Sequence, residues 1–154
     1  MIIKILTIGH KPNETELETI NYYQKQLPKN LVVNFINLRG EQNSNLSKKE
    51  VLLKESKIIL SKISKSDYVV SWDSRGKQYN SEEFSEFVKE SQLSKKEIIF
   101  IVGGSFGLSE QVLARSDLIL SASLLTFPHR LFRLILMEQI YRAYTIITKK
   151  TYHK

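Results

Sequence analysis

The stretch IIFIVGGSFGLS, residues 98–109, joins an apolar run to a glycine-rich segment. A short continuous run of β-branched and aromatic residues is typical of a buried strand, which we predict over residues 97–102. Gly103, Gly104 and Gly107 then let a ligand approach backbone N–H groups that can donate to it. The spacing G-G-x-x-G differs from the dinucleotide fingerprint G-x-G-x-x-G. This segment is therefore a candidate ligand turn, with an ordinary tight turn as the alternative.

Four other apolar runs predict strands that alternate with helices along the chain. The strands are expected over residues 2–8, 31–38, 68–72 and 117–122, with a turn over 73–77. Helices are expected over 14–27 before Pro28, from Ser47 to about residue 63, after caps at Ser81 and Ser109, and from Pro128, in the first turn, to residue 147. The alternation predicts one α/β domain over residues 1–154, in which helices sandwich a mostly parallel sheet.

The last of these helices is apolar on nearly every side. Between Leu131 and Ile147 the apolar residues are interrupted mainly by Arg133, Glu138, Gln139, Arg142 and Thr145. A helix of this kind must be covered on more than one face. A small domain offers few layers to do so, and we therefore predict a homodimer packed around this helix.

Composition and charge exclude several classes of protein. Of the 154 residues, 42% are hydrophobic and 25% charged, as in folded globular domains. The chain has no Cys, which excludes disulfides, a thiolate zinc site and a Cys nucleophile. Since neither a signal peptide nor an apolar run of about 18 residues is present, we expect a cytoplasmic protein that does not use a membrane. The net charge is +7, and it is concentrated in residues 129–154, so a polyanion is the expected partner.

A second candidate ligand loop spans Ser123 to His129. In α/β sheets, ligands bind beyond the carboxyl ends of the strands, and this loop follows the strand predicted over 117–122. Together with the glycine turn it could hold a flat heteroaromatic group such as adenine. The alternative is core packing, in which Leu124, Leu125 and Phe127 plug the end of the sheet.

Three further features have a chemical and a structural interpretation. His129 can contact a ligand or simply pack at a helix start, and Asp73 can accept a ribose hydroxyl or simply form a turn. The end of the chain, Thr151-Tyr152-His153-Lys154, combines an aromatic ring, an imidazole and a cation. These groups can stack an RNA base, accept a proton and neutralise phosphate. A frayed terminus is the alternative.

Six motifs, in their order along the chain, resemble those of one family, and the resemblance covers essentially the whole chain. They are Ile8-Gly9, Val102-Gly-Gly-Ser-Phe-Gly107-Leu, Leu120-Ser, Thr126-Phe-Pro-His129, Glu138-Gln-x-Tyr-Arg-Ala143 and Tyr152-His-Lys154. The chain resembles the RlmH-type methyltransferases of the SPOUT superfamily, which methylate N3 of a pseudouridine in large-subunit (23S) ribosomal RNA. The resemblance implies a parallel-sheet α/β sandwich with a carboxyl-terminal trefoil knot, an exception to the rule that chains avoid knots.

The resemblance also assigns roles to residues. S-adenosylmethionine would be the cofactor, without any metal, and it would be bound by Trp72, Gly103, Gly104, Gly107, Ser123, Leu124, Leu125, Thr126, Phe127 and Pro128. Trp72 stands where the family usually has a small aliphatic residue. The catalytic residues would be Arg142, Tyr152, His153 and Lys154, with His153 as the leading candidate base. His129, Arg130, Arg142 and Lys154 would bind the substrate, and the tail of one subunit would complete the pocket of the other.

The expected substrate is ribosomal RNA and not DNA. A short basic chain without an added RNA-binding domain is expected to depend on a large preformed surface, which favours the assembled ribosome over free RNA. Two alternatives remain open: a SPOUT enzyme that acts on another base or on a ribose 2′-hydroxyl, and a non-catalytic assembly factor that binds RNA through its basic end.

Overall fold

The computed structural model describes residues 1–94 and 97–153; Lys154 and the side chain of His153 lie outside the described part. Strands and helices alternate along the chain, as the sequence predicts. The elements are β1 (Ile2–Ile8), α1 (Glu14–Gln24), β2 (Val32–Leu38), α2 (Lys48–Leu60), β3 (Tyr68–Gln78), α3 (Ser81–Leu93), β4 (Ile98–Val102), α4 (Glu110–Arg115), β5 (Leu118–Ser121), α5 (His129–Ile147) and a short 3₁₀ helix, Thr151–His153.

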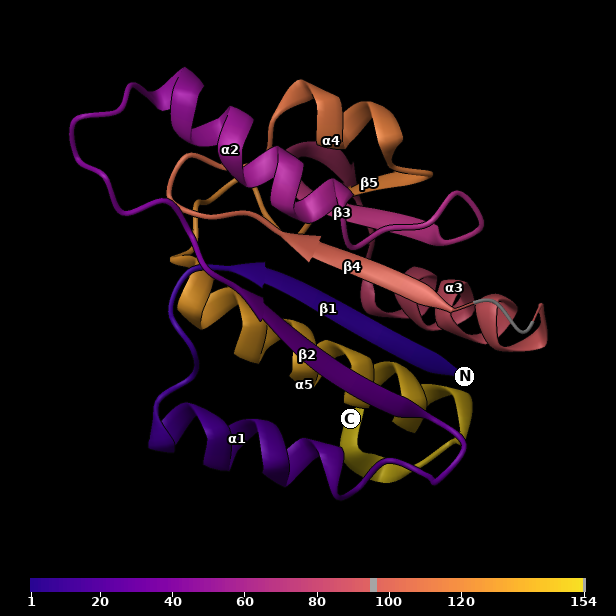
Figure 1. Cartoon of the computed structure of the whole chain (residues 1–154). Coiled ribbons are helices and arrows are strands. Elements are labelled where there is room, and N and C mark those ends of the chain that lie inside the picture. The colour runs from indigo at the N-terminus through magenta and orange to yellow at the C-terminus, as the bar shows by residue number, and fades with distance from the viewer. Residues whose placement is uncertain (95–96, 154) are drawn as a thin grey trace.

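The five strands form one sheet in the order β2-β1-β4-β3-β5, and every neighbouring pair is parallel. Helices α2 and α4 cover one face, while α1, α3 and α5 cover the other (Figure 1). Each face has its own buried cluster, because side chains alternate between the faces of a strand. The predicted α/β sandwich is confirmed. No helix within the described ranges has both the length and the hydrophobicity needed to cross a bilayer.

The third strand differs from the prediction. We expected it to end at Trp72 and to be followed by a turn over 73–77, but β3 continues to Gln78 with a register shift between Trp72 and Lys77. Gly76 makes this possible: a Cβ there would lie 2.5 Å from the carbonyl carbon of Leu120. Residues 73–77, which favour a turn locally, thus extend β3 because the strand pairs with β5.

Several helix boundaries also differ. The first helix ends at Gln24 and not at residue 27, because the residues before Pro28 form i→i+3 turns. The cap of α3 is Asn80, not Ser81, and Glu83 completes its capping box. Pro128 stands at the N-cap of α5, one residue before the first turn. The caps predicted at Ser47 and Ser109 are confirmed.

Candidate active site

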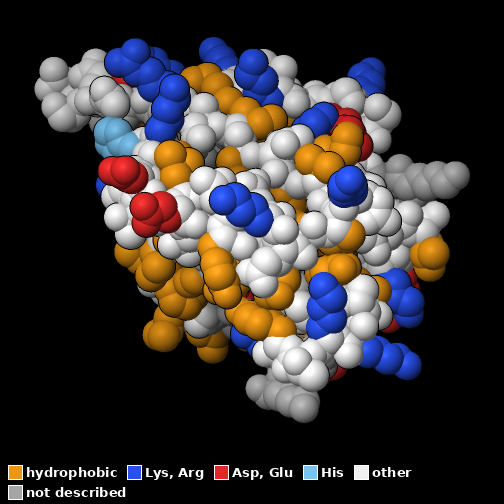
Figure 2. Space-filling view, turned by 90° about the horizontal axis from the view of Figure 1, so that it is seen from below, with side chains coloured by type: hydrophobic (Ala, Val, Ile, Leu, Met, Phe, Trp, Pro, Cys, Tyr) orange, Lys and Arg blue, Asp and Glu red, His pale blue; other side chains and the backbone are white. Residues whose placement is uncertain are grey.

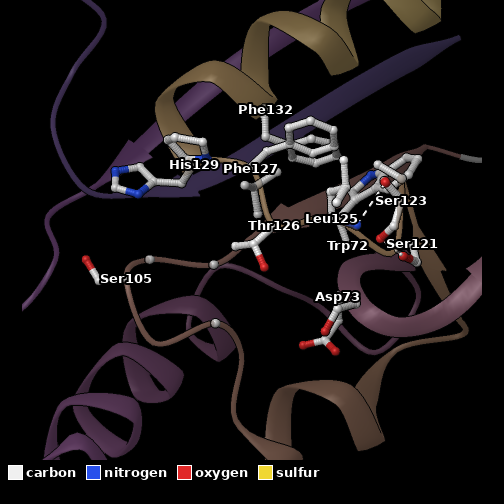
Figure 3. Close-up of a pocket in the computed structure, with 17 residues that line it drawn as sticks. Trp72, Asp73, Ser105, Ser121, Ser123, Leu125, Thr126, Phe127, His129 and Phe132 are labelled. Atoms are coloured by element: carbon white, nitrogen blue, oxygen red, sulfur yellow. Dashed lines mark hydrogen bonds between the residues drawn. The ribbon is translucent and has the colours of Figure 1, made fainter.

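A cavity of about 500 Å³ opens at the carboxyl ends of β4 and β5, beside residues 72–74 of β3. Its size lies within the range of cofactor pockets, about 300–1,000 Å³. The structure brings together here every residue predicted to contact the cofactor except Leu124 (Figure 3). The lining residues are Trp72, Asp73, Ser74, Val102, Gly103, Gly104, Ser105, Gly107, Ser121, Ala122, Ser123, Leu125, Thr126, Phe127, Pro128, His129 and Phe132.

The glycine turn forms one wall of the cavity and requires its glycines. The Gly107 N–H donates to the Gly104 carbonyl at 3.1 Å, and Gly107 has a φ of 76°, which favours glycine. A Cβ on Gly103 would lie 2.6 Å from the Gly107 carbonyl oxygen. The turn therefore has a compact conformation that larger residues at these positions would disturb.

The loop after β5 forms the opposite wall. Ser123 organises it: the Leu125 N–H donates to the Ser123 hydroxyl, and the Ser121 hydroxyl donates to the Ser123 carbonyl, both at 2.9 Å. Leu124 is 86% exposed and Leu125 73% exposed, so neither plugs the sheet. Phe127 alone packs against the core, and the core-packing interpretation holds only for this residue.

Trp72 lies between this cavity and a second one. Its ring contacts Phe84, Phe100 and Phe132 at centroid distances of 5.3–5.9 Å. The indole Nε1 is buried and has no hydrogen-bond partner among the described residues. A buried unpaired donor is costly, and an acceptor on a bound cofactor would satisfy it. The cavity residues thus fit a polar, cofactor-sized ligand.

Asp73 lines the cavity (Figure 3). It is held by hydrogen bonds from Arg75. The Arg75 Nε donates to its Oδ1 at 2.8 Å, and this bond lowers the pKa of the Asp73 carboxyl. The Arg75 backbone N–H also donates to Oδ1, at 3.0 Å. Asp73 therefore binds Arg75 within β3 and also presents a carboxylate next to the cavity.

His129 closes the end of the cavity opposite Trp72, with its imidazole directed away from Trp72 (Figure 3). Its buried Nε2 lies 2.9 Å from the position that a Cβ on Gly9 would occupy. Burial, followed by the positive charges of Arg133 and Arg130, lowers the pKa of His129 and so favours the neutral imidazole. His129 thus packs at the helix start and also lines the cavity.

The second cavity, of about 530 Å³, shares five residues with the first and extends along α5. The shared residues are Trp72, Ser121, Ala122, Phe127 and Phe132, and the far end is lined by Gln139, Arg142 and Ile146. Arg142 therefore lies in a cavity adjoining the predicted cofactor site. The sequence analysis did not identify Ser121 and Phe132 as cavity residues, although Ser121 lies within the strand predicted over 117–122 and ends β5.

Tyr152, the predicted tail residue whose side chain the structure describes, is not among the residues that line the first cavity. Helix α5 has 19 residues, which corresponds to about 28 Å at 1.5 Å per residue. His129 begins this helix, and the chain folds back after its other end, so that Tyr152 contacts Glu138 and Tyr141 along α5. The terminus is thus docked over residues 151–152. The side-chain position of His153 and that of Lys154 lie outside the described residues.

Comparisons with known proteins agree with this geometry. A family model described as "Predicted SPOUT methyltransferase" matches residues 1–153. The proteins named "Ribosomal RNA large subunit methyltransferase H" from Clostridium acetobutylicum and Clostridium botulinum (strain Hall) are 42% and 38% identical, and each alignment covers 100% of both chains.

Solved structures show the same fold at low sequence identity. A probable methylase family protein from Haemophilus influenzae Rd KW20 has a TM-score of 0.58 and 12% identity, over 99% of this chain and 70% of that one. A putative methylase family protein from Neisseria gonorrhoeae has a TM-score of 0.53 and 12% identity, over 91% of this chain and 81% of that one.

Proposed function

The chain belongs to the SPOUT methyltransferase family, and from this premise we propose that it transfers a methyl group from S-adenosylmethionine to N3 of a pseudouridine in large-subunit (23S) ribosomal RNA. Relatives about 40% identical over their full length carry the name ribosomal RNA large subunit methyltransferase H, which supports an rRNA substrate. The observation that carries the proposal is the cavity between the glycine turn and the loop after β5. The protein would act in the cytoplasm, on the assembled ribosome.

The cofactor would occupy this cavity. When bound, S-adenosylmethionine supplies an electrophilic sulfonium methyl group, so the protein needs no metal to activate it. Gly103 and Gly104 would hold one side of the cofactor and residues 123–128 the other, while the unpaired Nε1–H of Trp72 would donate to it. The protein's contribution is then mainly alignment of donor and acceptor.

A second subunit would bring the tail to the cavity. Within one subunit Tyr152 packs against Glu138 and Tyr141 of α5 and does not line the first cavity, so the catalytic tail would come from another copy. One side of α5 is incompletely covered, with Leu131 47% exposed and Ile135, Gln139, Arg142 and Ile146 half-buried at helical spacing. Figure 2, which views the side of α1 and α5, shows a hydrophobic patch there. These features support a homodimer that buries α5.

The tail would handle the proton and the charge of the reaction. N3–H of pseudouridine is an imide, and it must lose its proton before or during attack on the methyl group. His153 would accept this proton, while Arg142 and Lys154 would stabilise negative charge that develops on the base. Arg130, with a side chain 42% exposed near the cavity, would contact the RNA backbone.

The direct test is methyl transfer from labelled cofactor to ribosomes, free large subunits and naked RNA, followed by mapping of the modified base. We expect one modified pseudouridine and highest activity on assembled ribosomes. Label at a ribose or at another base would overturn the proposed substrate. Absence of saturable cofactor binding in calorimetry would indicate an RNA-binding protein without catalysis.

Subunit mixing tests whether the tail acts across the dimer. Gly103→Ala subunits and subunits lacking residues 152–154 are each expected to be inactive. Their mixture should recover activity, because one mixed active site combines an intact cavity with an intact tail. Unfolding curves would first establish that each variant is folded. A mixture of folded variants as inactive as its components would contradict shared sites.

A further inference from the structure

Glu138 lies at the centre of the contacts that hold the end of the chain. Its Oε1 accepts hydrogen bonds from Nη2 of Arg142 at 2.6 Å and from the Tyr152 hydroxyl at 3.0 Å. Its Oε2 accepts from the side-chain amide of Gln139 at 2.6 Å. The Glu138 side chain is only 17% exposed, and charge-assisted bonds shielded from water are strong. One carboxylate thus links the tail to Arg142.

Aromatic contacts fix the Tyr152 ring beside this carboxylate. The ring packs edge-on against Tyr141 at a centroid distance of 4.8 Å, and the Arg142 guanidinium lies 5.3 Å from its centre. The Tyr152 hydroxyl also lies 3.5 Å from that of Tyr23 on α1. Burial and these hydrogen bonds raise the pKa of Tyr152, so its hydroxyl remains protonated and continues to donate.

The chain reverses sharply to reach this position. Lys149 has a φ of 55° and is the only non-glycine residue with positive φ among the described residues. Its N–H donates to the Ile146 carbonyl, and the Lys150 N–H donates to the Thr145 carbonyl at 2.8 Å, which is the Schellman pattern. A lysine in this conformation costs about 1–2 kcal/mol, and such strain persists only where surrounding contacts enforce it. The docked Tyr152 provides such contacts.

We propose that Glu138 is a positioning residue that docks the tail on its own subunit and fixes Tyr152 relative to Arg142. The subunit therefore presents its tail preformed to the partner's cavity, before RNA binds. The consequence for turnover rests on the proposed function, whereas the docking itself does not. Glutamine at position 138 keeps the shape of the side chain but removes the charge that attracts Arg142 and Tyr152.

The test compares Glu138→Gln and Tyr152→Phe with Glu86→Gln, which removes the same charge from an exposed site on α3. Hydrogen exchange of the amides of residues 149–153 reports docking, and kinetics on ribosomes report turnover. With one charge-assisted bond lost, we expect exchange about tenfold faster and kcat about tenfold lower in Glu138→Gln. The KM for ribosomes and the affinity for S-adenosylmethionine should remain within about twofold, because those contacts are elsewhere. Glu86→Gln should behave as wild type.

The double variant provides the decisive comparison. If Glu138 acts on the tail through the Tyr152 hydroxyl, Tyr152→Phe should add little to the exchange rate of Glu138→Gln. Additive effects, or unchanged exchange in Glu138→Gln, would overturn the proposal. A general loss of thermal stability together with cofactor affinity would show a purely structural role and also overturn it. If the wild type transfers no methyl group but Glu138→Gln still exchanges faster, the docking of the tail is supported and the proposed function is refuted.

Discussion

Glu16 of α1 and Arg133 of α5 form an ion pair of 2.7 Å in which the arginine side chain is 1% exposed. Arg133 also donates to the His10 carbonyl at 2.8 Å, and Arg130 bonds the same glutamate at 3.0 Å. Glu16 in addition completes the capping box of α1 with Asn13. This cluster fixes the loop after β1 against the start of α5, beside the cavity.

Glu16→Gln is predicted to destabilise the fold. It leaves the buried Arg133 guanidinium without its counter-charge, and loss of one member of such a pair costs about 3 kcal/mol. Urea unfolding at pH 7 measures the change, with Glu14→Gln, at an exposed position in the same helix turn, as the control. Equal stability of the two variants would show that Glu16 does not stabilise the fold through Arg133.

The ion pair between Glu16 and Arg133 also predicts that the stability of the fold depends on pH. Hydrogen bonding from Arg130 is the largest of the causes that lower the pKa of Glu16 to about 2. A carboxyl with a depressed folded-state pKa contributes stability above its unfolded pKa, about 4.3, and loses it as the pH falls towards 2. The difference in unfolding free energy between wild type and Glu16→Gln should therefore shrink over this window. A constant difference would show that the glutamate charge is unimportant.

Gly103→Ala is predicted to weaken cofactor binding at least about tenfold, because a misplaced binding wall readily costs 1.4 kcal/mol or more. The new Cβ would lie 2.6 Å from the Gly107 carbonyl oxygen, so the turn must move. Calorimetry with S-adenosylmethionine measures the effect. Ser105→Ala, in the same turn but exposed, is the control, and identical affinities for the two variants would argue against the glycine wall.

Trp72 offers an optical probe because it is the only tryptophan of the chain. Cofactor binding should change its fluorescence, since the ring lines the cavity. Trp72→Phe keeps an aromatic ring but loses the unpaired Nε1 donor, and we expect binding about fivefold weaker, the value of one neutral hydrogen bond. Unaltered emission on saturation, with unaltered affinity in the variant, would place the cofactor elsewhere.

Leu131→Glu is predicted to produce monomers that still bind cofactor but transfer no methyl groups. Leu131 is 47% exposed on α5, so the charge spares the core and would disturb only the proposed subunit contact. Sedimentation measures the oligomeric state. Leu93→Glu on α3, at a position 76% exposed, is the control and should sediment as wild type. If Leu131→Glu remains dimeric and active, α5 does not form the interface.

The sequence predicts the elements better than their ends. Apolar runs locate all five strands. The glycine turn and the loop after β5 stand out in the sequence because both follow predicted strands, although each also had a purely structural alternative. The extension of β3 through Gly76 depends on pairing with Leu120, far along the chain, and local turn residues conceal it. Asn80 competes with Ser81 as a cap, and only Glu83 three residues later distinguishes them.

The tail illustrates a different limit. Residues 152–154 carry groups that could take part in chemistry, but the local sequence is equally compatible with a frayed terminus and with a docked one. Docking depends on Lys149 in a conformation that lysine rarely adopts, and on Glu138, which lies 14 residues before Tyr152. Such a contact is determined by tertiary packing and cannot be inferred from periodicity.

Because the indole of Trp72 lines both cavities, the two chambers are not independent targets for small molecules. A compound that displaces this ring from one side alters the shape of the other. Inhibitors that bridge the two cavities would therefore contact the indole from both sides.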